Sequence, residues 1–158
     1  MSQEFVKVSV VGVRVEMPSN QPIILLQDEP GQKYLPIWIG AVEATSIAFA
    51  QQGVVPARPL THDLLLEIIK NLGRQIKEVK IISLKDGIFY SELIFDNGLV
   101  ISARPSDSIA LALRVEAPIL VAVDVLTSAG IEIPVEEQDE LDKFRQFLEE
   151  VNPDDFKS

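Results

Sequence analysis

The sequence contains a single histidine, His62, which stands beside an aspartate, Asp63, in the stretch "RPLTHDLL". Histidine exchanges a proton near neutral pH without special tuning, so an imidazole beside a carboxylate can act on a ligand, a metal or a reacting group. The same pair also suits the first turn of a helix, where an acidic residue complements the positive end of the helix dipole. A catalytic role and a purely structural one are both open for His62. Arg58, four residues earlier, is a candidate anion contact.

A second group of polar residues, "RPSD", lies directly before the apolar helical pattern "SIALAL". Helix-start chemistry explains most of this group, because Ser106 is predicted as the N-cap and Asp107 suits the helix dipole. Pro105 is predicted to end the preceding strand. Arg104 has no such structural explanation. It therefore indicates an anion such as phosphate nearby, with Ser106 as a second contact.

Three predicted helix starts each carry an acidic residue, namely Glu43, Asp63 and Asp107. We expect these starts to converge in the fold, bringing carboxylates and one imidazole together with the guanidinium groups of Arg58 and Arg104. Hard divalent cations such as Mg²⁺ or Mn²⁺ prefer carboxylate oxygens, and guanidinium groups clamp phosphates. Glu43, Asp63 and Asp107 are therefore the predicted metal ligands.

The composition of the chain excludes several classes of protein and of functional site. Cysteine is absent, which excludes disulfides, thiolate metal sites and cysteine nucleophiles. No apolar run approaches the roughly 20 residues that cross a bilayer, and "MSQEF" has no secretory pattern, so a cytoplasmic protein without a membrane partner is expected. Glycine-rich phosphate loops and zinc-helix motifs are also absent from the sequence, and no organic cofactor is expected. Most of the net charge of −10 belongs to residues 132–158, which hold ten acids and three bases.

Apolar patterning predicts a mixture of strands and helices. The stretch "FVKVSVVGVRVE" predicts a strand, and "QPIILLQDEPGQKYLPIWIG" predicts a hairpin that turns at proline and glycine. Helices are predicted at "AVEATSIAFAQQG" and at "LTHDLLLEIIKNLG", the second with Thr61 as its N-cap. The second half predicts three more strands, the helix "SDSIALALRVEA", a short strand, a brief helix and an acidic terminal helix. The apolar stripe predicted for the helix after Thr61 comprises Leu64, Leu65, Ile68, Ile69 and Leu72.

The two halves of the sequence resemble each other. "SIAFAQQGVVP" (46–56) and "SIALALRVEAP" (108–118) align without a gap at an offset of 62 residues, and the strands before them fall at the same offset. The similarity predicts duplicated β-β-β-α units within 6–56 and 77–118. Such units give an α+β fold with antiparallel-rich mixed sheets covered by helices. We expect a main domain over 1–135 and an acidic helical extension over 136–158.

The order and spacing of "LPIWIG", an alanine-rich helix after Glu43, "RPLTHDL" and "ARPSDSIALA" resemble the bifunctional nuclease domain family, a bacterial and plant group. The resemblance covers roughly residues 5–135. The terminal "LDKFRQFLEEVNPDDF" is similar to the extension of actinobacterial members. The resemblance implies an oligomeric α+β protein that cleaves DNA and RNA, aided by a divalent metal.

Two functions follow as alternatives. In the nuclease reading, His62 moves a proton, Asp63 and Asp107 with Glu43 hold the metal, and Arg104 stabilises charge on the phosphoryl group. In the alternative reading, the chain is a non-catalytic, homo-oligomeric module that binds an anionic metabolite or a partner protein through its arginines. An acidic chain opposes nucleic-acid binding, because lysine and arginine supply most of the sequence-independent affinity for phosphates.

Overall fold

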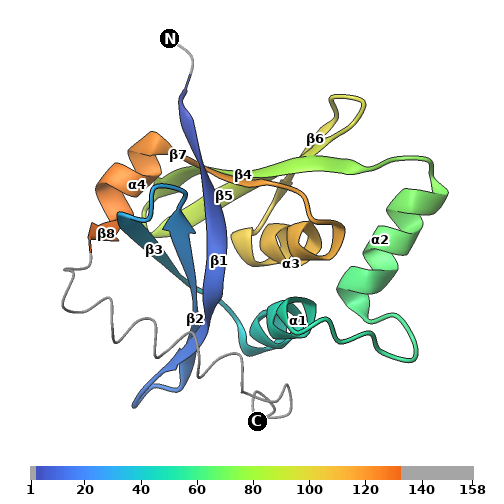
Figure 1. Ribbon diagram of the computed structural model, residues 1–158, viewed down its shortest axis with the longest axis horizontal. Coiled ribbons are helices and arrows are strands. Elements are labelled where there is room, and N and C mark those ends of the chain that lie inside the picture. The colour runs from blue at the N-terminus through green and yellow to red at the C-terminus, as the bar shows by residue number, and fades with distance from the viewer. Residues whose placement is uncertain (1–2, 133–158) are drawn as a thin grey trace.

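The computed structural model describes residues 3–132, which form one eight-stranded sheet covered by helices (Figure 1). The strands lie in the order β6-β5-β4-β7-β1-β2-β3-β8. Every neighbouring pair in this part of the chain is antiparallel except β4 and β7. This confirms the predicted α+β class with an antiparallel-rich mixed sheet.

The first half of the chain forms three strands followed by a helix, as predicted. The strands are β1 (Phe5–Glu16), β2 (Gln21–Asp28) and β3 (Lys33–Trp38), and they lead into α1 (Ala41–Gln51). Gly31 has a φ of 78° in the turn between β2 and β3. This left-handed conformation costs glycine little because it has no Cβ, which is why "DEPGQ" turns the chain there.

The second half repeats the arrangement. The strands β4 (Ile76–Lys85), β5 (Ile88–Phe95) and β6 (Val100–Ala103) lead into α3 (Pro105–Val115). Each half therefore has the predicted β-β-β-α order. One helix of this second half, α3, carries Asp107, and the helix α1 of the first half carries Glu43.

The two halves are joined by β7 (Ile119–Ala122), which lies between them in the sheet. It pairs in parallel with β4 and antiparallel with β1. The predicted brief helix follows as α4 (Val123–Ala129), and β8 (Ile131–Glu132) then adds to β3 at the edge of the sheet. One continuous sheet therefore holds both duplicated units in a fixed relation.

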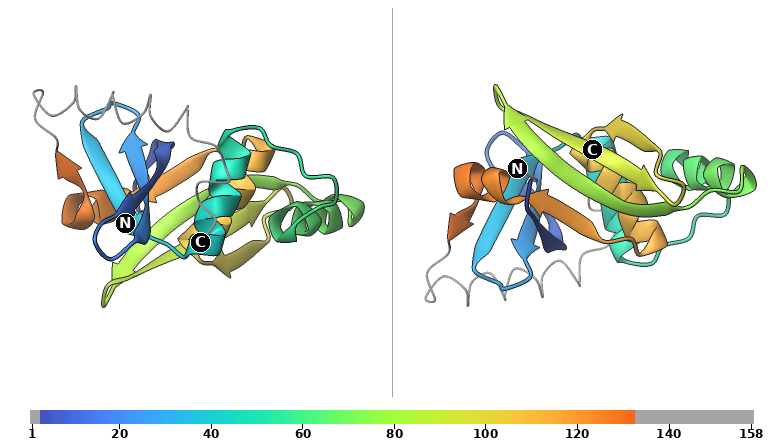
Figure 2. Two further views of the ribbon diagram at one scale, coloured as in Figure 1. Left: turned by 90° about the horizontal axis from the view of Figure 1, so that it is seen from below. Right: turned by 90° about the horizontal axis from the view of Figure 1, so that it is seen from above.

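The helices α1 and α3 pack against each other and against the sheet, α1 on β1 and β2, and α3 on β4 and β5 (Figures 1 and 2). Small side chains permit this close packing: Ala44 and Ala48 of α1 and Ala110 and Ala112 of α3 are all buried. The alanine-rich helix sequences thus serve a helix–helix contact, and that contact brings the starts of the two helices together.

The helix between the halves, α2 (Thr61–Asn71), differs from the prediction in two ways. Thr61 is the first helical residue, not the N-cap; Leu60 is the N-cap, and its N–H donates to Asp63 Oδ2 at 3.2 Å. The predicted apolar stripe is also mostly exposed, with 49% of Leu64 and 74% of Leu72 accessible. Of the predicted stripe only Ile69 packs against the core, together with His62 and Leu66. The rest of the stripe marks a surface.

The start of α3 also differs from the prediction. Arg104 is the N-cap and Pro105 is the first helical residue, so Ser106 lies inside the helix and is 6% exposed. Proline fits this position because its fixed φ suits a helix and it lacks the N–H that would otherwise be unpaired. Pro105 therefore begins the helix, and β6 has already ended at Ala103.

The predicted extension over 136–158, with its acidic helix, lies outside the described residues. Within 3–132, no helix combines the length and the apolar character needed to cross a membrane.

The packing of α1 gives a test of the fold. Ile47 is fully buried, and truncating it to alanine should lower the free energy of unfolding by about 2–5 kcal/mol because a cavity replaces its side chain. Val42 lies on the same helix with 79% of its surface exposed, and Val42→Ala should change that free energy by less than about 0.5 kcal/mol. Urea unfolding of both variants measures the difference. Equal effects would contradict the described orientation of α1.

Candidate active site at the starts of three helices

Asp107, in the first turn of α3, holds the polar cluster together. Its Oδ2 accepts a hydrogen bond from Arg104 Nε at 2.9 Å, and its Oδ1 lies 2.9 Å from His62 Nε2. The carboxylate therefore joins the N-cap of its own helix to the start of α2. The convergence of helix starts expected from the sequence is present for these residues.

Arg104 extends the cluster to α1, because its Nη2 donates to Glu43 Oε1 at 2.9 Å. Glu43 bends back over the start of its own helix, and its Oε2 occupies the space that a Cβ at position 40 would need. Any residue larger than glycine at position 40 would therefore displace the Glu43 carboxylate from this position. The guanidinium group of Arg104 thus bridges two acids from the two duplicated units.

His62 is 8% exposed and uses both of its ring nitrogens. Its Nδ1 lies 2.7 Å from Ser46 Oγ, opposite the Nε2 contact to Asp107. A carboxylate can only accept, so Nε2 carries the proton that is donated to Asp107. In the neutral imidazole, Nδ1 then accepts the hydroxyl proton of Ser46. Asp107, His62 and Ser46 therefore form a directed hydrogen-bond relay.

Arg114, in the last turn of α3, closes the cluster on its inner side. Its Nε donates to Asp63 Oδ1 at 2.9 Å, and its Nη1 donates to the carbonyl of Ala110 at 2.8 Å. Its Nη2 donates to the carbonyl and the hydroxyl of Ser46, at 3.1 and 3.0 Å. Only 11% of the Arg114 side chain is exposed, so this guanidinium group ties α1, α2 and α3 together from within.

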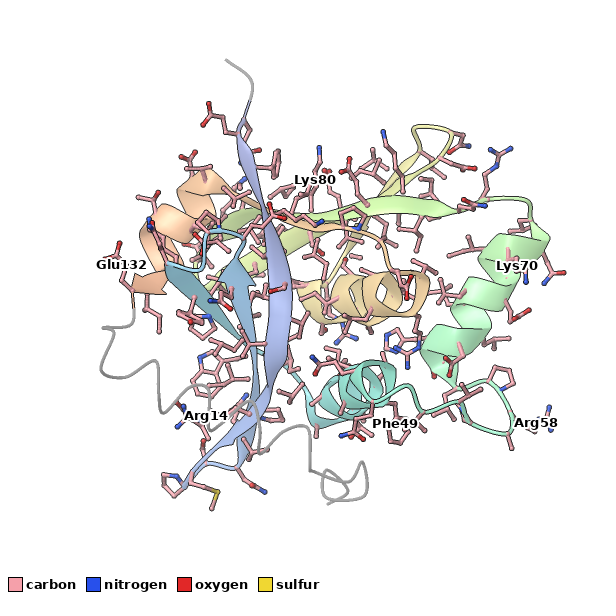
Figure 3. All side chains as sticks on the ribbon, viewed as in Figure 1. Arg14, Phe49, Arg58, Lys70, Lys80 and Glu132 are labelled. Carbon is pink, nitrogen blue, oxygen red and sulfur yellow. The ribbon has the colours of Figure 1, made fainter. Side chains whose placement is uncertain are left out.

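The contacts form one unbroken polar chain, whose members in order are Glu43, Arg104, Asp107, His62, Ser46, Arg114 and Asp63. Two predicted residues lie outside it. Arg58 is exposed on the connector before α2 and has no polar partner among residues 3–132 (Figure 3). Ser106 lines a neighbouring cavity that also touches Arg104.

Sequence reasoning missed Ser46 and Arg114. The repeat carried a signal for Ser46, since it begins the repeated "SIA" at the same position as Ser108. Arg114 is the only charged residue between Asp107 and Glu116. It falls two helical turns after Asp107, on the same side of the helix. A buried arginine in an apolar helix needs a partner, and that partner, Asp63, comes from α2.

Asp107 and Arg104 each shift the pKa of the other. Burial raises the pKa of Asp107, but the hydrogen bonds from Arg104 and His62 outweigh this effect and hold the pKa below its usual range. The hydrogen bond to Asp107 correspondingly raises the pKa of Arg104. Asp107 is therefore ionised at neutral pH, which makes it a constant hydrogen-bond acceptor rather than a proton donor.

The three carboxylates predicted as metal ligands do not form a ligand set in this arrangement. Glu43 and Asp107 lie on the same guanidinium group, and Asp63 is held by Arg114. Among residues 3–132, no three histidine, aspartate or glutamate side chains are grouped as a metal site requires. Arginine supplies the positive charge that a cation would bring, so we derive no chemical step through a metal.

Arg114 offers a test of the inner part of the cluster. Arg114→Lys keeps the charge but cannot make the divergent contacts to Asp63, Ala110 and Ser46, so it should lower the free energy of unfolding by about 1–3 kcal/mol. The exposed Arg74, paired only loosely with Asp96 at 3.6 Å, provides the matched control Arg74→Lys, which should have almost no effect. Equilibrium unfolding measures both. A neutral Arg114→Lys would show that the buried contacts contribute nothing.

Comparison with known proteins agrees with this picture. The family model for the bifunctional nuclease domain matches residues 24–134, which include every member of the polar chain. An uncharacterised protein of Mycobacterium tuberculosis is 53% identical over 161 residues, covering 96% of this chain and 98% of that protein. Bifunctional nuclease 2 of rice is 28% identical over 127 residues, covering 76% of this chain but 39% of the rice protein. Bifunctional nuclease of Oryza minuta is 23% identical over 146 residues, covering 86% of this chain and 44% of that protein. The chain belongs to the bifunctional nuclease domain family.

Proposed function

We propose that this protein hydrolyses phosphodiester bonds of DNA and RNA at the outer part of the polar chain, around Arg104 and Asp107. The observation that carries the proposal is the shared Asp107 carboxylate, ionised and fixed between Arg104 and His62 within a domain of this family. The relatives named bifunctional nucleases in rice species support the same substrate class.

The exposed fraction of each side chain determines which residues can contact a substrate. Arg104 has 65% of its side chain exposed, so it can reach a phosphate and stabilise the negative charge that develops during attack. Asp107, with 29% exposed, can orient a water molecule as hydrogen-bond acceptor. His62 has only 10% exposed and no free ring nitrogen, which makes it a positioning residue for Asp107 rather than a group that meets substrate.

The reaction balances as a hydrolysis. The oxygen of the attacking water forms a new bond to phosphorus, and the bond between phosphorus and the departing sugar oxygen breaks. One proton of the water ends on that departing oxygen, and the phosphate product keeps the negative charge that Arg104 faces. Asp107 directs the water without keeping its proton, since its lowered pKa makes it a weak base.

The participation of a divalent metal in cleavage is a separate proposal. If Mg²⁺ or Mn²⁺ takes part, Glu43 and Asp107 are the candidate ligands nearest the phosphate contact, and Arg104 must move from at least one of them. Carboxylates held by arginine bind a cation less readily, because the cation has to displace an existing charge partner.

Cleavage assays test the proposal. Asp107→Asn and Arg104→Gln should each lower the rate of cleavage of plasmid DNA and of RNA by about 100-fold, through loss of water orientation and of charge stabilisation. Arg74→Gln removes an exposed arginine far from the cluster and should retain full activity. Each protein is assayed with Mg²⁺, with Mn²⁺ and with EDTA.

The controls separate the protein from a contaminant. Activity that persists equally in Asp107→Asn and Arg104→Gln would arise from a host nuclease and would overturn the proposal. Activity of the native chain in EDTA would overturn the metal requirement alone. Circular dichroism confirms that the variants are folded before their rates are compared.

A second candidate function is a non-catalytic binding module, and one observation favours it: each charge of the polar chain already has a partner within the cluster. A cluster in which every charge is paired is typical of a structural network, and it is also typical of an active site without its substrate. The same assay decides between the two, because a binding module gives no cleavage with any metal while an anionic ligand still raises its melting temperature.

We also propose that the chain forms homo-oligomers through α2. Its solvent-facing side carries a row of large apolar residues, of which Leu64 and Ile68 are each about half exposed. Apolar surfaces of this kind mark protein contacts. The predicted apolar stripe then has a function as a subunit contact, with a second copy of the chain as its partner.

Sedimentation velocity tests the contact. Ile68→Ser should shift the native protein from an oligomer towards the monomer, because it removes apolar surface from the centre of the row. Lys70→Ser, a change at an exposed charged residue of the same helix, should leave the oligomer intact. A native protein that sediments as a monomer would overturn the proposal directly.

A further inference from the structure

A cavity of about 360 Å³ opens beside Arg104, between the end of β3, the turn that joins β4 and β5, and the start of α3. Trp38 and Phe89 belong to its apolar walls, and Arg104 and Ser106 belong to its polar end. Its volume lies within the range of about 300–1,000 Å³ that is usual for small-molecule sites. No residue of the cavity except Arg104 takes part in the polar chain.

The apolar side of the cavity exposes groups that a folded chain normally covers. Trp38, at the last position of β3, is 52% exposed, and Ile88, at the first position of β5, is 55% exposed. An exposed indole beside a cavity is suited to stack on a flat ring. Stacking of this type accepts any nucleobase, because every base has a π-face.

The polar side contains an unsatisfied group. Ser106 is 6% exposed, yet its hydroxyl has no hydrogen-bond partner among the residues that the structure describes. Buried hydroxyl groups are normally paired. A serine that lines a cavity without a partner therefore points to a ligand that supplies one.

Backbone donors at the start of α3 add to this hydroxyl. The first intrahelical bond is donated by Ser108 N–H to the carbonyl of Arg104 at 3.0 Å. The N–H groups of Ser106 and Asp107 come before it and have no partner within 3–132. Unpaired N–H groups at a helix start, together with the helix dipole, favour an anion.

Arg104 completes the polar side. Its Nε and Nη2 are used by Asp107 and Glu43, which leaves Nη1 without a partner in the described part of the chain. Glu43 and Asp107 together carry two formal negative charges against the single positive charge of Arg104, so net attraction cannot hold an anion here. The directed donors, namely the Ser106 hydroxyl, the unpaired N–H groups and Arg104 Nη1, must do so.

We propose that this cavity binds one nucleotide of the substrate, with the base against Trp38 and the phosphate at the start of α3, near Ser106 and Arg104. The proposal rests on the proposed nuclease function and names the subsite that function uses. An aromatic wall and an anion site in the lining of one cavity fit a base joined to a phosphate better than they fit either part alone. The phosphate thereby comes to lie beside Asp107.

The fluorescence of Trp38 reports binding directly, because it is the only tryptophan of the chain. Adenosine monophosphate, adenosine and inorganic phosphate are titrated into the native protein at low salt. Adenosine monophosphate should quench the fluorescence and bind at least about tenfold more tightly than adenosine, as expected when charge-assisted hydrogen bonds to phosphate are added. Inorganic phosphate should bind without comparable quenching.

Ser106→Ala is the most informative variant. Its hydroxyl has no protein partner, so the variant should fold with an unchanged melting temperature while its affinity for adenosine monophosphate falls several-fold. Its affinity for adenosine should not change. Arg104→Gln should act in the same direction, and Arg74→Gln, which changes an arginine remote from the cavity, should leave all three titrations unchanged.

The outcomes distinguish this proposal from the nuclease proposal. Equal binding of adenosine and adenosine monophosphate, or equal binding by native protein and Ser106→Ala, would overturn the phosphate contact. Absence of quenching would overturn the stacking on Trp38. Cleavage of nucleic acid without nucleotide binding in the cavity would leave the nuclease in place and reject the subsite. Binding with the stated variant effects, but without cleavage, would uphold the subsite and reject the nuclease.

Discussion

The Asp107 carboxylate is the contact on which the arrangement of the three helices depends. One oxygen binds Arg104, which also reaches Glu43 of α1, and the other binds His62 of α2. Because a carboxylate cannot donate, its position fixes the tautomer of His62 and thus the direction of the bond to Ser46. A charge at this point is stable only because two donors offset its burial, as its lowered pKa indicates. The outer contacts of the polar chain therefore meet at Asp107. Its removal would take away a partner of Arg104 and of His62, while Arg114 would still join the three helices from within.

Duplication supplies the framework of this site but not its chemistry. Ser46 and Ser108 occupy the same position of the repeated helix, yet Ser108 pairs with Ser91 in the core at 2.8 Å, whereas Ser46 pairs with His62. Threonine stands at position 45 where the second repeat has Asp107. The helix α2, which carries His62, follows only the first unit. The second unit therefore supplies no second histidine at an equivalent position. A symmetric fold thus carries one asymmetric site.

Local patterns predicted the strands, the helices and their duplicated order, because turn residues and apolar periodicity act within a few residues. They also identified five of the seven members of the polar chain, since acids and arginines at helix starts are visible in the sequence. Ser46 and Arg114 were missed because their roles come from α1 packing against α3, which no local signal reports. The predicted N-caps of α2 and α3 were wrong by one and two residues, respectively. There, a backbone contact from Asp63 and the preference of proline for a first helical position decided the start.

The placement of β7 has a consequence for how the chain reaches this structure. Residues 5–8 of β1 pair with residues 119–122 of β7, so strands at the two ends of the domain meet at its centre. During synthesis, β1 leaves the ribosome long before its second neighbour and has only β2 beside it. Pairing over such a sequence separation is slow, since the chain must close a large loop before any contact rewards it. We therefore expect closure of the sheet to be a late event in folding, and the cluster at the helix starts to form only when both halves have come into register.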